Sequence, residues 1–157
     1  MVGEGTTAIF ITFLLAMLGY AGLTTVLLLT LRREVPVRLW RGVALVILAH
    51  VGMVWTFRYE WDFALAIRNG YAGAVLFHGA FATILASTVA REWLARVLIQ
   101  IAFVIVSLGA LGATFKYHVV FMYRVPVILC AIAGLGAFAW RYVLKRGATA
   151  ETGRSVI

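Results

Sequence analysis

The sequence predicts an all-α integral membrane protein, a bundle of five transmembrane helices. Of its 157 residues, 64% are hydrophobic and only 13% are charged, whereas about a quarter of the residues of a soluble domain are charged. The mean hydropathy is +1.00. Five apolar segments each reach the roughly 20 helical residues needed to cross a bilayer. We therefore expect one transmembrane domain over residues 1–146, followed by a polar cytoplasmic tail over residues 147–157.

Short polar or aromatic connections separate the five expected spans. The spans cover Thr7–Leu31, Leu39–Phe57, Gly70–Ala90, Ala95–Phe115 and Val125–Leu144. The last two are expected to be separate helices, because a single helix over residues 95–144 would be about 75 Å long. Pro126 supports this division, since proline is favoured in the first turn of a helix. The first span has no basic segment before it and is expected to be retained.

The basic residues predict the orientation, because lysine and arginine concentrate in cytoplasmic loops. Ten of the 14 lie after the first and third spans and at the C-terminal end, and four lie in the other loops. The N-terminus should therefore face outward and the C-terminus the cytoplasm, in the inner membrane of a bacterium. The same distribution explains the net charge of +8 without nucleic acid as a partner.

Two histidines within the spans are the best candidates for function. His50 and His78 each lie about eight residues from the outer boundary, which is about 12 Å along a helix. Ionisable groups at this depth are costly and usually functional. Two imidazoles at one level predict axial ligands of a single haem b iron, provided that the connecting loop allows their helices to lie diagonally. Hydrogen bonding between helices is the alternative, and the small residues around His78 are also typical of close helix contact.

A second group of candidates lies at the outer boundary. His118 is expected either to bind a second cofactor or to be an interfacial residue without a ligand. Alternatively, His118 is expected to bind haem propionates or a quinone carbonyl together with the basic residues Arg58, Arg68, Lys116 and Arg124, because basic side chains form charge-assisted bonds with carboxylates.

The fourth span carries polar residues every seven positions, at Gln100, Ser107 and Thr114. Hydrogen bonds to other helices are the expected role of this face, and a polar track for protons or quinone is the alternative. Gly109 and Gly112 in the same span are expected to allow close helix contact, as are Gly134 and Gly136 in the fifth. The single cysteine, Cys130, is expected to be a packing residue.

In architecture, the chain resembles the small membrane anchors of respiratory oxidoreductases. Its five spans and outward N-terminus are similar to the membrane subunit of respiratory nitrate reductases, but it has no histidine in the last span and only three histidines in all. The resemblance implies a haem b subunit that passes electrons to or from quinone or a partner subunit, in contact with lipid and with other membrane or peripheral subunits. The alternative is a cofactor-free accessory subunit of a larger membrane complex. Pigment binding and transport remain further alternatives, although no charged side chain lies deep in any span, which disfavours a transporter.

Overall fold

The computed structural model describes residues 3–32, 34–68, 70–116 and 118–144. Most of these residues form helices, and none of them forms a strand. The elements are α1 (Gly3–Arg32), α2 (Val37–Phe57), α3 (Phe63–Ile67), α4 (Tyr71–Val89), α5 (Glu92–Lys116), the 3₁₀ helix η1 (His118–Tyr123), α6 (Arg124–Ala139) and the π-helical turn η2 (Trp140–Leu144).

Among the described residues, five helical segments are long and apolar enough to cross a membrane, which confirms the number expected from the sequence. The fifth covers Val120–Tyr142, so it joins part of η1, all of α6 and part of η2. A break after Lys116 separates it from α5, as the length argument requires. The predicted polar cytoplasmic tail over residues 147–157 lies outside the described residues.

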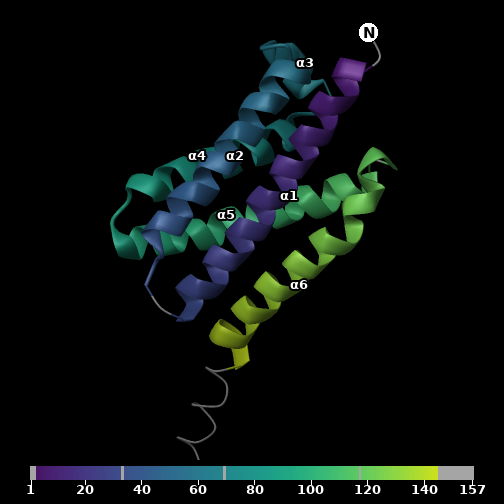
Figure 1. The fold of residues 1–157 in the computed structure, drawn as a ribbon. Helices are drawn as coiled ribbons and strands as arrows, with labels where there is room; N and C mark the ends of the chain where they lie inside the picture. Colours follow the sequence, from purple (N-terminus) through teal and green to yellow (C-terminus); the bar gives the residue numbers. More distant parts are fainter. Residues whose placement is uncertain (1–2, 33, 69, 117, 145–157) are drawn as a thin grey trace, which may run out of the picture.

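The bundle has two ends that differ in composition. One end carries α3, the start of α1 and the turn between α5 and α6, and we call it the α3 end (Figure 1). The other end carries Arg32, Arg38, Arg91 and Arg96, and we call it the arginine-rich end. Because the number of long helices is odd, the first of them begins and the last of them finishes at opposite ends of the bundle (Figure 1).

Helix α1 is the most buried of the five long helices, and it packs against α2, α5 and α6. Leu23, Val26 and Leu27 on α1 are completely buried. Gly22 allows α2 to approach, because a Cβ atom at this position would lie 2.7 Å from a methyl group of Val43. The core is thus centred on α1, and α2, α5 and α6 pack against it.

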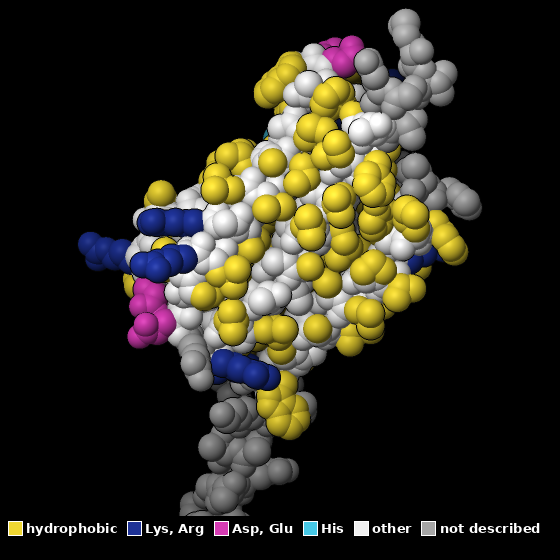
Figure 2. Space-filling view, viewed as in Figure 1, with side chains coloured by type: hydrophobic (Ala, Val, Ile, Leu, Met, Phe, Trp, Pro, Cys, Tyr) yellow, Lys and Arg dark blue, Asp and Glu magenta, His cyan; other side chains and the backbone are white. Residues whose placement is uncertain are grey.

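The flank of the bundle is apolar. Figure 2 shows hydrophobic side chains spread along it, with lysine and arginine side chains gathered near the helix ends. Leu45, Leu129 and Ile132 are each more than 60% exposed. Apolar surface on this scale is unusual on a monomeric soluble protein. The helices are therefore compatible with contact to a lipid bilayer.

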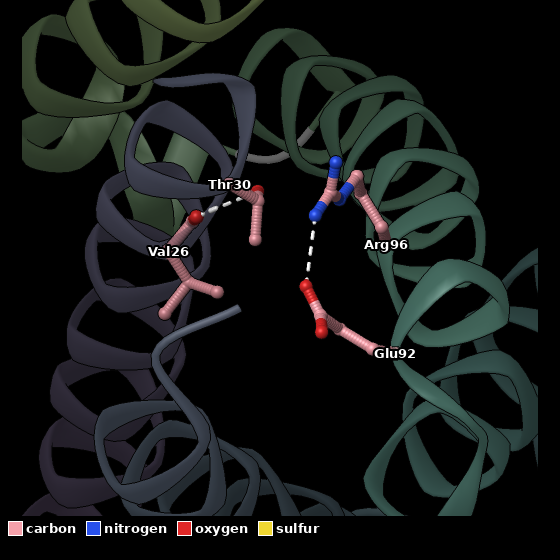
Figure 3. Close-up of polar contacts among 4 residues, drawn as sticks. All are labelled: Val26, Thr30, Glu92 and Arg96. Atoms are coloured by element: carbon pink, nitrogen blue, oxygen red, sulfur yellow. Dashed lines mark hydrogen bonds and ion pairs between the residues drawn. The ribbon is translucent and has the colours of Figure 1, made fainter. Parts of the chain in front are cut away.

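Polar groups near the arginine-rich end make contacts within their own helices (Figure 3). The hydroxyl of Thr30 on α1 donates to the carbonyl of Val26 at 2.8 Å. In the first turns of α5, Arg96 donates to the carboxylate of Glu92 at 2.9 Å. An exposed pair of this spacing contributes only about 0.3–0.5 kcal/mol. Neither contact joins α1 to α5.

Candidate functional site

Four helices form a closed ring around a cavity. In this ring α1 contacts α2, α2 contacts α4, α4 contacts α5, and α5 returns to α1. Helix α6 packs outside the ring against α1 and α5. The cavity inside has a volume of about 570 Å³, which lies within the range of small-molecule and cofactor sites.

Small residues on α4 and α5 leave the interior of the ring open. Gly73, Gly109 and Gly112 line the cavity, and a Cβ atom added at any of them would meet nothing within 4 Å. The expectation that Gly109 and Gly112 bring helices into close contact is therefore wrong, and so is the same expectation for Gly136. Gly73, Gly109 and Gly112 instead leave open volume in the cavity, because no neighbouring helix fills the space beside them.

Gly134 behaves as the sequence predicts. A Cβ atom at this position on α6 would overlap the ring of Phe103 on α5. Phe103 is completely buried and lies against the ring of Tyr20 on α1, with centroids 5.9 Å apart and planes inclined by 19°. Gly134 thus brings α6 close to the side of the ring where α1 meets α5.

His50 lines the cavity, and its orientation is set by a hydrogen bond to α1. Its Nδ1 atom lies 3.0 Å from the carbonyl oxygen of Thr12. Because a carbonyl oxygen can only accept, Nδ1 must carry the hydrogen and the neutral ring keeps its lone pair on Nε2. Histidines that bind metals usually hold the other ring N–H in this way. Nε2 of His50 therefore has the chemistry of a metal ligand or of an acceptor for a hydroxyl group.

His78 has the same tautomer but a different environment. Its Nδ1 lies 2.7 Å from the carbonyl oxygen of Ala74 in the preceding turn, and its ring is surrounded by Trp55, Phe63 and Phe77 at centroid distances of 5.2–6.5 Å. Nε2 is buried and has no hydrogen-bond partner. The cavity lining includes Ala74 and Phe77 but not His78.

The two histidines lie at one level, as the sequence predicts, but on adjacent helices. His50 lies seven residues before the end of α2 and His78 seven residues after the start of α4, so each is about 10 Å from the α3 end. Helices α2 and α4 contact each other, and therefore they do not take the diagonal placement that a shared iron was expected to need. His50 bonds to α1, whereas His78 packs against Trp55 and α3.

The arginine candidates lie at the α3 end, and they differ in how far their side chains are already engaged in contacts within the protein. Arg58 and Arg68 are exposed, at the C-terminal caps of α2 and α3. Arg124 instead donates from Nε to the carbonyl of Thr114 at 2.9 Å, and its guanidinium lies over Phe121, 4.6 Å from the ring centroid. This contact satisfies a carbonyl in the last turn of α5, which otherwise has no partner within the helix.

The cavity reaches the α3 end between the ends of α2, α5 and η1. Tyr59, Lys116 and Tyr123 line it there. The third histidine, His118, belongs to η1 by its backbone, but its side chain lies outside the part of the chain that the structure describes.

The predicted polar face of α5 makes two contacts with other elements. The hydroxyl groups of Ser107 and Tyr20 are 2.8 Å apart in the core, and Gln100 donates to the hydroxyl of Tyr142 at 3.2 Å. Thr114 instead donates to the carbonyl of Leu111 in its own helix. Tyr20, which also lines the cavity, was not among the candidates. Its position in the middle of an apolar span is the signal that could have identified it.

Other metal-binding chemistry is sparse. Within the described ranges, no group of three or more histidine, cysteine, aspartate or glutamate side chains is placed to hold a metal ion. Cys130 is partly buried and packs against the core, as predicted. A haem iron needs only one or two protein ligands, so His50 remains a sufficient donor for it.

Comparison of the chain with protein-family models, with curated proteins and with solved structures finds no match. Within its described residues, the fold is a bundle with five helices long and apolar enough to cross a membrane and a cavity beside one histidine.

Proposed function

We propose that this chain is the membrane subunit of an electron-transfer complex and binds haem b in the cavity, with His50 as axial ligand. The observation that carries the proposal is the Nδ1 contact with the Thr12 carbonyl, which leaves the lone pair on Nε2 in a histidine that lines the 570 Å³ cavity. A histidine held in one tautomer beside an apolar cavity is the arrangement that a haem iron requires.

Different residues of the chain would contribute different parts of the haem site. Thr12 fixes the ring of His50, and apolar side chains such as Phe13, Phe81 and Ile84 keep water away from the macrocycle. Bound haem supplies one-electron chemistry, which the protein tunes through the axial ligand and the polarity of the pocket. Electrons would pass to or from quinone or a partner subunit, since the chain carries no motif for substrate chemistry of its own.

Basic groups at the α3 end are the natural partners of the propionates. Arg58 and Arg68 are exposed there, and Lys116 lines the cavity. Arg124 is the weakest of the four candidates, because its guanidinium already donates to Thr114 and stacks on Phe121. Substituting Arg58 or Arg68 should therefore weaken haem retention more than substituting Arg124 does, measured as haem per protein after dilution.

A visible spectrum of the purified full-length protein, with a pyridine haemochrome assay, tests the proposal. We expect haem b in the wild type, and a loss of at least tenfold in haem content in His50→Ala. Gly136→Leu, on a glycine outside the cavity lining, should keep the haem content of the wild type. Absence of a Soret band in both oxidised and reduced protein would refute the proposal.

His78 enters the same experiment as the second predicted ligand. If His50 and His78 share one iron, His78→Ala will lose haem as completely as His50→Ala does. If His50 binds the iron without His78, His78→Ala will keep its haem, because His78 lies outside the cavity lining. The comparison therefore separates the two forms of the proposal.

The proposed orientation places the N-terminus outside and the C-terminus in the cytoplasm of a bacterial inner membrane. The concentration of basic residues at the arginine-rich end supports it. Single cysteines tested with a membrane-impermeant thiol reagent on intact cells can check it. In a Cys130→Ala background, Arg68→Cys should be labelled from outside and Arg91→Cys only after lysis; each variant loses one positive charge, so they are matched.

A cofactor-free accessory subunit is the second candidate function. It is favoured by the fact that both ring Nδ1 atoms already bond to backbone carbonyls, so that each histidine has a structural role without a ligand. This candidate predicts that His50→Gln and His78→Gln assemble normally with the partner subunits and retain the activity of the complex. Loss of haem from either variant would count against it.

A further inference from the structure

We infer that His50 is the only histidine that the described part of the cavity offers to the iron, and that the space across from it, beside Gly109, binds a small diatomic ligand of the haem iron. This inference rests on the proposed function, because it needs haem in the cavity. It goes beyond electron transfer, since an iron with one open position can take up a gas such as carbon monoxide.

The order of the helices places α5 opposite His50. In the ring, α2 contacts α1 and α4, and α5 contacts the same two helices, so α2 and α5 face each other across the cavity. His50 lies seven residues from the end of α2, and Gly109 lies seven residues from the end of α5, both measured from the α3 end. At 1.5 Å per residue, the two positions are at the same level.

The wall across from His50 has no second soft or nitrogen ligand at that level. Among the cavity residues that α4 and α5 contribute, none is histidine, cysteine or methionine. Thr114 bonds to its own helix, and Lys116 is at the last residue of α5, about 10 Å above Gly109. Two axial ligands must lie on opposite faces of the macrocycle, and this wall supplies none for the second face.

Donors on α1 lie at other levels. Met17 lines the cavity five residues, or about 7.5 Å, further from the α3 end than Thr12, to which the ring of His50 bonds. Tyr20 also comes from α1, and its hydroxyl is 2.8 Å from that of Ser107. The sixth position of the iron would therefore face the unfilled volume beside Gly109.

Gly109 also supplies the means to test the inference, because a Cβ atom at this position meets nothing within 4 Å. Gly109→Leu places an apolar side chain in the space assigned to the diatomic ligand. Gly109→His instead offers a second imidazole at the level of His50. Gly136→Leu and Gly136→His are matched controls, since Gly136 is equally open but outside the cavity lining.

The experiment compares the spectra of these full-length variants in detergent, oxidised, reduced and reduced with carbon monoxide. We expect the wild type to be high-spin and to form a carbon monoxide adduct. Gly109→Leu should keep its haem but bind carbon monoxide at least tenfold more weakly, and Gly109→His should become low-spin and unreactive. The Gly136 variants should behave as the wild type does.

Two outcomes would overturn the inference, and they are distinguishable. A wild type that contains haem but is low-spin and unreactive has a second axial ligand, and the proposed function survives; His78→Ala or His118→Ala would then identify the ligand by restoring carbon monoxide binding. A wild type without haem overturns the proposed function, and the inference falls with it.

Discussion

The contact between Gly134 and Phe103 makes the most direct prediction about the fold. Gly134→Ala adds one methyl group, which would overlap the Phe103 ring. Phe103 is completely buried against Tyr20 and cannot move aside without disturbing α1. Overpacking of this kind typically costs about 1–3 kcal/mol. For a chain of this size, that corresponds to a fall in Tm of roughly 2–12 °C.

Thermal unfolding of the purified protein in detergent measures the effect, with Gly136→Ala as the control. A Cβ atom at Gly136 meets nothing within 4 Å, so this variant should be neutral or gain up to about 1 kcal/mol from the higher helix propensity of alanine. Phe103→Leu should recover part of the loss in Gly134→Ala, because contacting residues show coupling of about 0.5–3 kcal/mol. Equal Tm values for Gly134→Ala and Gly136→Ala would refute the packing of α6 against α5.

Two further predictions concern polar contacts. Tyr20→Phe removes the hydroxyl that bonds to Ser107. The free energy of unfolding should fall by about 0.6 kcal/mol, as for other membrane hydrogen bonds. Ser107→Ala should then lower the free energy of unfolding less in the Tyr20→Phe protein than in the wild type. Additive effects would show that the two hydroxyl groups do not interact. Arg124→Gln removes the donor to the Thr114 carbonyl and should destabilise the last turn of α5 by about 1 kcal/mol. Amide hydrogen exchange at the C-terminal end of α5 should therefore become faster. Unchanged exchange there would contradict the prediction.

The sequence predicted the parts of the structure that depend on hydropathy. Five helices follow from the length and composition of five apolar segments. The common level of His50 and His78 follows as well, because position along a spanning helix is fixed by distance from its ends. The contacts of Gln100 and Ser107 with other elements were also predicted from their spacing.

The predictions that failed concern helix rotation and neighbours. Gly109 and Gly112 were expected to bring helices together and instead line the cavity. A glycine has the same sequence signature in both situations, because close contact and open space each require a missing side chain. Only the position of the neighbouring helices distinguishes them.

The sequence by itself therefore determined that the chain forms five helices long and apolar enough to cross a membrane, and how far along them His50 and His78 lie. The tertiary structure decided that α2 and α4 are adjacent, that His50 borders the cavity and that His78 lies among aromatic rings outside its lining. The physical reason is that helices suited to lipid are apolar on every side. Their sequences carry little record of which face turns inward, and packing against neighbouring helices makes that choice.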